Sequence, residues 1–153
     1  MAEASIRERA QEIVDEFSLF DDWMGKYEYL IELGESLPQL DEKYKTGRYK
    51  IKGCQSQVWI RPHFEDDLVF YQGDSDAIIT KGLVALLIRV MSGQPPQAVA
   101  EAELSFLDQI GMKDHLSSTR KNGLASMVKQ LKLYALAHAG AERNGNTFNQ
   151  ATR

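Results

Sequence analysis

The sequence is poor in cysteine, with Cys54 the only one among 153 residues. A single thiol cannot form a disulfide within the chain, and it supplies too few ligands for a zinc site. The three histidines, His63, His115 and His138, stand at no metal-ligand spacing to one another or to Cys54, so we expect no metal site. One thiol and no sign of disulfide pairing favour a reducing cytoplasm as the protein's location.

Long hydrophobic runs are also absent. The longest apolar run covers residues 83–88, far short of the ~20 residues that a transmembrane helix needs. The N-terminal residues show no basic segment followed by an apolar one, so we expect no secretory signal. The net charge is −4, whereas nucleic-acid binding usually leaves a basic face. These absences argue against a membrane or nucleic-acid partner, and no phosphate-binding glycine loop indicates a nucleotide site.

Hydrophobic periodicity predicts several helices. Apolar residues recur at helical spacing in three segments. The first covers about residues 5–18, and the third covers residues 80–91. The second begins after a cap at Asp21 or Asp22 and ends before Gly34. A short helix is expected from Gln97, one turn at 106–110, and a last helix from Ser117 or Ser118 to about 139–140. The remaining residues, 141–153, are polar and aperiodic, so we expect a disordered tail there and one domain over residues 1–140.

Between these helices the pattern changes to a period of two. Residues 57–64 alternate apolar and polar side chains, 65–67 form a polar turn, and 68–71 return, which predicts a β-hairpin. Residues 38–53 are a polar connector, and 73–77 are expected to form a loop, with a short strand possible at 77–79. Helices, a small antiparallel sheet and further helices predict an α+β fold with the helices packed on one face of the sheet.

Cys54 lies between the polar connector and the first strand, in the segment Gly53-Cys54-Gln55-Ser56-Gln57. Gly53 permits a backbone turn that other residues resist, so we expect the thiol at the tip of a surface loop. An unperturbed thiol has a pKa of about 8.5, and a nearby cation or backbone N–H groups would increase its thiolate share. The alternative is a small buried hydrophobic residue, the usual place of a free cysteine.

A thiol enzyme needs a base beside the sulfur, and a histidine is the usual choice. His63 follows on the strand that leads away from the loop, and His138 lies at the end of the last helix. His115 is in a loop and could fold back toward Cys54, but nothing in the sequence requires it. We interpret all three as structural or surface histidines and keep a thiol enzyme based on His115 as an alternative.

Two further segments are candidates for the site. The last helix begins with Arg120 near its positive end, and Gly123 costs the helix about 1 kcal/mol relative to alanine. Basic residues at the positive end of a helix and a glycine inside it are both locally unfavourable, and such features together often mark function. Solvent exposure of Arg120 and Lys121 and close packing at Gly123 would explain them equally well. The acids Asp74 and Asp76 can form a turn and a helix cap, and an ion pair from one of them to Arg120 is conceivable.

Four motifs in order resemble the SufE family, the sulfur acceptors of cysteine desulfurases. They are Gly53–Trp59, Tyr27–Gly34 followed by Leu37-Pro38, Gly73–Ala77 followed by Lys81-Gly82-Leu83, and His115-Leu116 with Ser118, Arg120 and Gly123-Leu124. The likeness covers about Trp23 to His138. It implies a sandwich like that of the SufE and IscU iron–sulfur proteins.

The resemblance implies that Cys54 accepts sulfur as a persulfide and hands it to an iron–sulfur scaffold. It implies a SufS-like or CsdA-like desulfurase as donor, which carries the pyridoxal phosphate, a SufBCD-like scaffold complex as recipient, and no cofactor on this chain. Roles in partner docking or thiolate support are implied for Arg120, Gly53, Gln55, Ser56, Gln57 and Asp74. A regulatory binding module with a structural Cys54, and a sulfur relay to another pathway, remain alternatives.

Overall fold

The computed structural model describes residues 4–143. The elements, in chain order, are α1 (Ile6–Phe17), α2 (Trp23–Glu35), the short 3₁₀ helix η1 (Glu42–Tyr44), β1 (Val58–Glu65), β2 (Leu68–Ser75), α3 (Ile78–Met91), α4 (Pro96–Glu101), α5 (Phe106–Gln109), α6 (Met112–His115) and α7 (Ser118–Arg143). Within the described residues, no helix combines the length and apolar character needed to cross a membrane.

The two strands form the predicted antiparallel hairpin. Val58 pairs with Ser75 and Glu65 with Leu68, and the two-residue turn between the strands holds Asp66 and Asp67 at positive φ, as tight hairpin turns require. Alternate residues of both strands are buried, among them Ile60. One face of the sheet therefore packs on helices, and the predicted α+β fold is confirmed.

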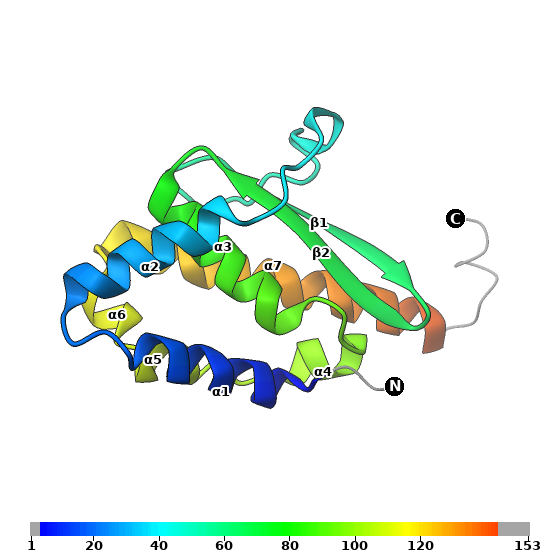
Figure 1. Ribbon diagram of the computed structural model, residues 1–153. Helices are drawn as coiled ribbons and strands as arrows, with labels where there is room; N and C mark the ends of the chain where they lie inside the picture. The colour runs from blue at the N-terminus through cyan, green and yellow to red at the C-terminus, as the bar shows by residue number, and fades with distance from the viewer. Residues whose placement is uncertain (1–3, 144–153) are drawn as a thin grey trace.

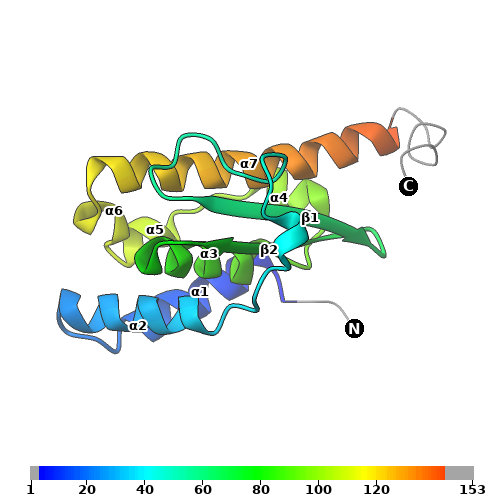
Figure 2. The same cartoon turned by 90° about the horizontal axis from the view of Figure 1, so that it is seen from above.

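Two hydrogen bonds fix the sheet to α7. The Tyr71 hydroxyl of β2 donates to the Leu131 carbonyl oxygen at 2.7 Å, and the Tyr134 hydroxyl of α7 donates to the Ile60 carbonyl oxygen at 3.1 Å. Because a buried hydroxyl needs a partner, these bonds set the register of α7 along the strands. Figures 1 and 2 show the sheet beside α7 and α3, with α2 and α1 on the other side of α3.

Helix α3 is the centre of the core, as its apolar sequence predicts. It buries Leu83, Val84, Leu86, Leu87, Val90 and Met91. Its close contact with α2 depends on two glycines. A Cβ on Gly82 would lie 2.5 Å from the Leu30 carbonyl oxygen, and one on Gly34 would lie 2.8 Å from the Gly82 nitrogen. Gly34 therefore lies inside α2 as a packing residue, and its predicted place beyond the helix end is wrong.

Several other boundaries differ from the prediction. Strand β2 continues through residues 73–75, and α3 begins at Ile78, so the expected loop is shorter and no strand forms at 77–79. The polar connector is partly ordered, because η1 lies within it and Ile51 donates its backbone N–H to the Val58 carbonyl oxygen. Helix α7 extends to Arg143, past its predicted end, and the rest of the predicted tail lies outside the described residues.

Helices α2, α3 and α7 all begin at the same end of the molecule, at the left of Figure 1. The connector returns toward that end, and the loop before β1 passes over the first turns of α7 in Figure 2. The fold thus brings the Cys54 loop to the beginning of the last helix, although about 65 residues separate them in sequence.

Candidate functional site

The Cys54 loop lies directly on α7. The sulfur of Cys54 is 3.5 Å from the Gly123 carbonyl oxygen, and a Cβ on Gly123 would come within 3.3 Å of that sulfur. Gly53 has φ of +90°, and a Cβ there would lie 2.5 Å from the Ser126 hydroxyl oxygen. The two glycines therefore let the loop approach the helix, which confirms the close-packing interpretation of Gly123.

Both ends of this loop are anchored by backbone hydrogen bonds. At its start, the Ile51 N–H donates to the Val58 carbonyl oxygen at 2.8 Å. At its end, the Gln57 N–H donates to Asp76 Oδ1 at 2.9 Å, and the Asp76 N–H returns a bond to the Gln57 carbonyl oxygen at 3.2 Å. Asp76 is thus a loop anchor that sequence reasoning missed, although it stands in the same motif as Asp74.

Cys54 lines a small cavity of about 240 Å³ between the loop, α3 and the start of α7. Its lining consists of Cys54, Gln55, Ser56, Thr80, Leu83, Ser117, Thr119, Arg120, Gly123 and Met127. The structure therefore brings Gln55, Ser56 and Arg120 together with the thiol, while Gly53 and Gln57 hold the loop beside it. The hydroxyls of Thr80 and Thr119 were not foreseen, because they come from separate helices.

The environment of the thiol favours its protonated form at rest. Cys54 is half-buried, and burial raises the pKa of its thiol because the anion loses hydration. The sulfur also sits at hydrogen-bonding distance from the Gly123 carbonyl oxygen, an acceptor that only the neutral S–H can use. Arg120 lines the same cavity, and thiolate support by Arg120 stays a prediction.

Ser117 is the N-cap residue of α7. Its hydroxyl oxygen accepts the Arg120 backbone N–H at 3.2 Å, the bond that an N-cap residue makes. Ser117 also lines the cavity, so the cap of the helix is part of the wall around the sulfur. The first turn of α7 contains no acidic residue, which leaves the positive end of the helix dipole uncompensated by side chains.

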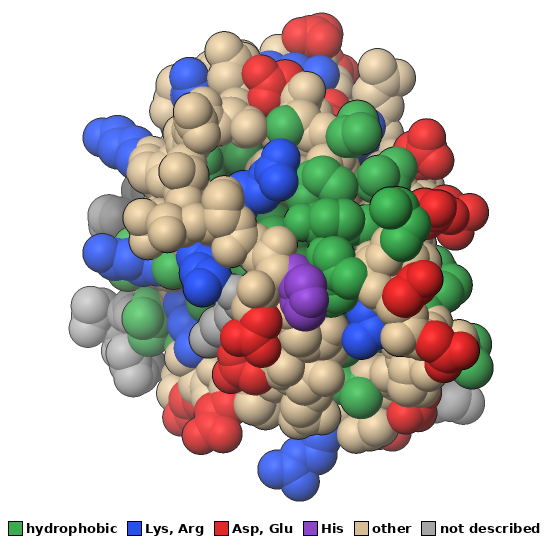
Figure 3. Space-filling view, turned by 90° about the vertical axis from the view of Figure 1, so that its left-hand side faces the viewer, with side chains coloured by type: hydrophobic (Ala, Val, Ile, Leu, Met, Phe, Trp, Pro, Cys, Tyr) green, Lys and Arg blue, Asp and Glu red, His purple; other side chains and the backbone are tan. Residues whose placement is uncertain are grey.

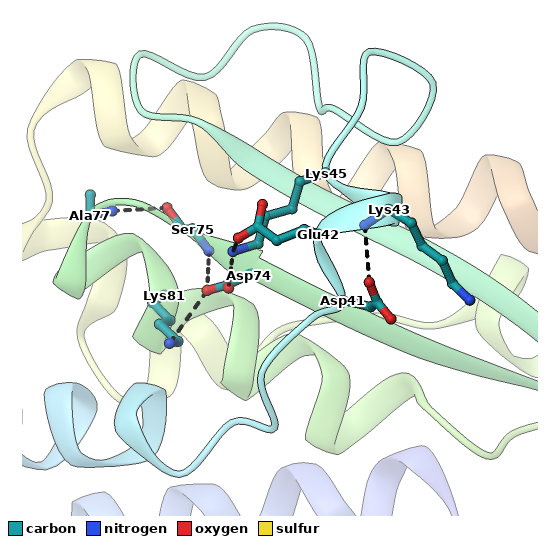
Figure 4. Close-up of polar contacts among 8 residues, drawn as sticks. All are labelled: Asp41, Glu42, Lys43, Lys45, Asp74, Ser75, Ala77 and Lys81. Atoms are coloured by element: carbon teal, nitrogen blue, oxygen red, sulfur yellow. Dashed lines mark hydrogen bonds and ion pairs between the residues drawn. The ribbon is translucent and has the colours of Figure 1, made fainter.

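The carboxylate of Asp74, in β2, is held by Lys45 of the connector and Lys81 of α3 (Figure 4). It lies 3.1 Å from Lys45 Nζ and 3.3 Å from Lys81 Nζ, and it accepts the Ser75 N–H. Burial raises the pKa of Asp74, but these bonds and charges outweigh that effect and keep it below its usual value. Asp74 does not line the cavity. Asp74 therefore links the connector to β2 and α3. Its ion-pair partners are Lys45 and Lys81, and not Arg120, the partner that the sequence made conceivable.

None of the three histidines lines the cavity described above. The His115 ring stacks on Trp23 at 3.9 Å, and its Nδ1 lies 3.0 Å from the Gly111 carbonyl oxygen. His138 stacks on Phe64, at the opposite end of β1 from the Cys54 loop. The geometry therefore gives no support to a thiol enzyme with a histidine base. Over residues 4–143, no cluster of three or more His, Cys, Asp or Glu residues is suited to hold a metal ion.

Comparison with known proteins points to one family. The sequence model of the SufE family, described as an Fe–S metabolism associated domain, matches residues 11–135. An uncharacterised SufE-like protein of Rhizobium etli is 42% identical over 135 residues, which cover 85% of this chain and 91% of the relative. SufE-like protein 1 of Arabidopsis thaliana, named as chloroplastic/mitochondrial, is 40% identical over 84% of this chain and 35% of its own length.

A solved structure has the same fold. The solution structure of a hypothetical protein from Thermus thermophilus superposes with a TM-score of 0.71, over 84% of this chain and 94% of that one, at 18% sequence identity. The likeness concerns the fold alone. The matched range of the family model, in contrast, includes Cys54, Asp76, Arg120 and Gly123, the residues that build the cavity and its loop.

Proposed function

This chain belongs to the SufE family, whose domain is associated with iron–sulfur metabolism, and from that premise we propose that it is a sulfur carrier. Cys54 accepts sulfur from a pyridoxal-phosphate-dependent cysteine desulfurase and passes it to an iron–sulfur scaffold. The observation that carries the proposal is the setting of the thiol. The single cysteine lies on a loop held by a few hydrogen bonds and lines a cavity. Among the described residues, no histidine and no second cysteine line that cavity.

The transfer step needs only a thiolate on Cys54. That thiolate attacks the outer sulfur of a persulfide on the donor's cysteine, a new S–S bond forms, and the old S–S bond breaks. The donor's cysteine leaves as a thiolate and takes up the proton that Cys54 lost. No net oxidation or reduction occurs, because one persulfide replaces another. A single thiol suits this task, since a second thiol nearby could attack the new persulfide and release sulfide.

The half-buried position of the sulfur supports a model in which docking of the partner determines when transfer occurs. Burial raises the pKa of Cys54, which keeps the thiolate fraction low in the free protein. The Gln57–Asp76 hydrogen bond is exposed and therefore contributes little, about 1 kcal/mol. We propose that a docked partner displaces the loop from Gly123, exposes the thiol and lowers its pKa toward the ordinary value. Arg120, in the cavity wall, is placed to favour the thiolate once the loop has moved.

The main alternative is a regulatory module that stimulates the desulfurase without carrying sulfur. The two functions differ in what Cys54→Ala does. A carrier loses all sulfur acceptance, whereas a regulator still stimulates the desulfurase. Measuring both sulfur on this chain and the rate of alanine formation by several purified desulfurases separates the functions and identifies the donor. The cytoplasmic location and the scaffold as recipient, as opposed to another pathway, stay predictions.

A further inference from the structure

Large hydrophobic side chains are exposed in two places on the described part of the protein. Leu19, Met24 and Ile78 are 79%, 66% and 65% exposed. They stand just before α2, in its first turn and at the first residue of α3, and we call them the end patch. Leu133 and Leu136, at 45% and 44%, lie in the second half of α7. Exposed apolar clusters on small proteins often mark contact surfaces.

The end patch adjoins the Cys54 cavity. Ile78 stands two residues before Thr80, which lines the cavity. On the other side, Trp23 of α2 stacks on His115 at 3.9 Å, and Ser117, two residues further on, is again part of the cavity wall. The starts of α2, α3 and α7 thus form one continuous surface. Figure 3 views this end of the molecule and shows hydrophobic side chains gathered on it.

We propose that the end patch is the docking surface for the protein that delivers sulfur, with Met24 and Ile78 as its buried anchors. The inference rests on the proposed function, because a donor must bring its persulfide within bonding distance of the Cys54 sulfur. A cavity of about 240 Å³ admits a loop but no domain, so the donor's surface must cover the rim beside it. Ile78 precedes the cavity-lining Thr80 by two residues, and Met24 lies in the first turn of α2; both are exposed and would lose apolar area on contact with the donor.

The charge of this surface agrees with a persulfide donor. Neither α3 nor α7 carries an acidic residue in its first turn, and Arg120 lies in the cavity wall. Helix N-termini without acidic side chains in the first turn favour anions, and the donor's cysteine leaves as a thiolate when its persulfide is attacked. Apolar area at the end patch thus lies beside an approach to the thiol that carries Arg120, while the exposed acids of the patch, Asp21 and Asp22, lie on its α2 side. Leu133 and Leu136 line a separate groove of about 780 Å³ beside residues 102–108.

The test measures binding in the absence of sulfur transfer. In the Cys54→Ser chain, the pair Met24→Glu and Ile78→Glu is compared with the matched pair Leu133→Glu and Leu136→Glu. Glutamate in the first turn of a helix is favourable, so the first pair leaves α2 and α3 stable, which a thermal melt checks. Titration of a purified desulfurase should show Kd raised at least about tenfold by the first pair and changed less than about twofold by the second.

Each outcome decides the proposal. An equal change for both pairs, a larger change for the α7 pair, or no binding of the Cys54→Ser chain to any purified desulfurase overturns it. A wild-type chain that is a dimer, made monomeric by Met24→Glu and Ile78→Glu, also overturns it, because a second copy then covers the patch. A chain that binds through the patch but takes no sulfur on Cys54 leaves the docking surface intact and contradicts the carrier function alone.

Discussion

The sulfur of Cys54 lies 3.5 Å from the carbonyl oxygen of Gly123, at a position of α7 where a Cβ would stand only 3.3 Å from that sulfur. This contact explains two features that look unrelated in the sequence: a lone cysteine after a glycine, and a glycine in the first turns of a helix. The helix gives up about 1 kcal/mol of propensity at Gly123 and gains a place where the thiol can rest. We interpret this place as the shelter of a reactive group.

Gly123→Ala is expected to increase the reactivity of Cys54 while leaving the protein at least as stable. The added Cβ would stand 3.3 Å from the sulfur, so the sulfur must move outward, and alanine favours the helix by about 1 kcal/mol. Alkylation of the thiol should be about two- to tenfold faster. Gly47→Ala is the control, because a Cβ on Gly47 meets nothing within 4 Å. An unchanged alkylation rate in Gly123→Ala would contradict the sheltering contact.

Removing the loop anchor should loosen the loop without unfolding the domain. Asp76→Ala deletes the acceptor of the Gln57 N–H and is expected to cost about 1 kcal/mol. Hydrogen exchange of residues 54–57 should become faster, while exchange in α3 stays slow. Asp76→Asn is the matched control, since its amide oxygen still accepts the bond, and protection close to wild type is expected there. Equal loss of protection in both variants would mean that charge, and not the bond, holds the loop.

Asp74 is expected to stabilise the fold and to leave the thiol unaffected. Asp74→Asn removes the buried charge that pairs with Lys45 and Lys81 and should lower the free energy of unfolding by about 1–3 kcal/mol. The folded-state pKa of Asp74 is lowered, so its contribution is present above the unfolded value of about 3.9 and is lost as pH falls through the folded value. Denaturant unfolding at pH 7 and pH 3 measures this, with Asp67→Asn on the exposed turn as control. Faster alkylation of Cys54 in Asp74→Asn would show that Asp74 also acts on the site.

The thiol should affect stability on the alkaline side. Burial raises the folded-state pKa of Cys54 above the unfolded value of about 8.5. Between these two pKa values the unfolded chain has already released the proton that the folded chain retains. The stabilising contribution is therefore complete below about pH 8 and is lost as pH rises through the folded value. Unfolding free energies of wild type and Cys54→Ser, measured from pH 7 to 10, should converge or cross as pH rises. A constant difference would indicate an unshifted thiol.

The sequence was sufficient for the elements with strong periodicity and for the chemistry of the single thiol. Asp22 caps its helix as predicted, and the hairpin and central α3 follow the expected patterns. Contacts between segments that are distant in the chain could not be predicted from the sequence. Gly34 has the local features of a helix end, but its role is to admit Gly82 of α3. Asp74 lies near the end of β2 and Asp76 just past it, and only the pairing of β1 and β2 decides which of them reaches the Cys54 loop.

The mass of the protein after reaction with a desulfurase shows whether Cys54 carries sulfur. The wild-type chain, its Cys54→Ser variant and its Gly123→Ala variant are incubated with purified desulfurase and L-cysteine, then digested without reductant and measured by mass spectrometry. We expect a gain of one sulfur atom, about 32 Da, on the Cys54 peptide of wild type and Gly123→Ala, and none in Cys54→Ser. A wild-type Cys54 peptide without added sulfur, while the desulfurase is nevertheless stimulated, would contradict the carrier function.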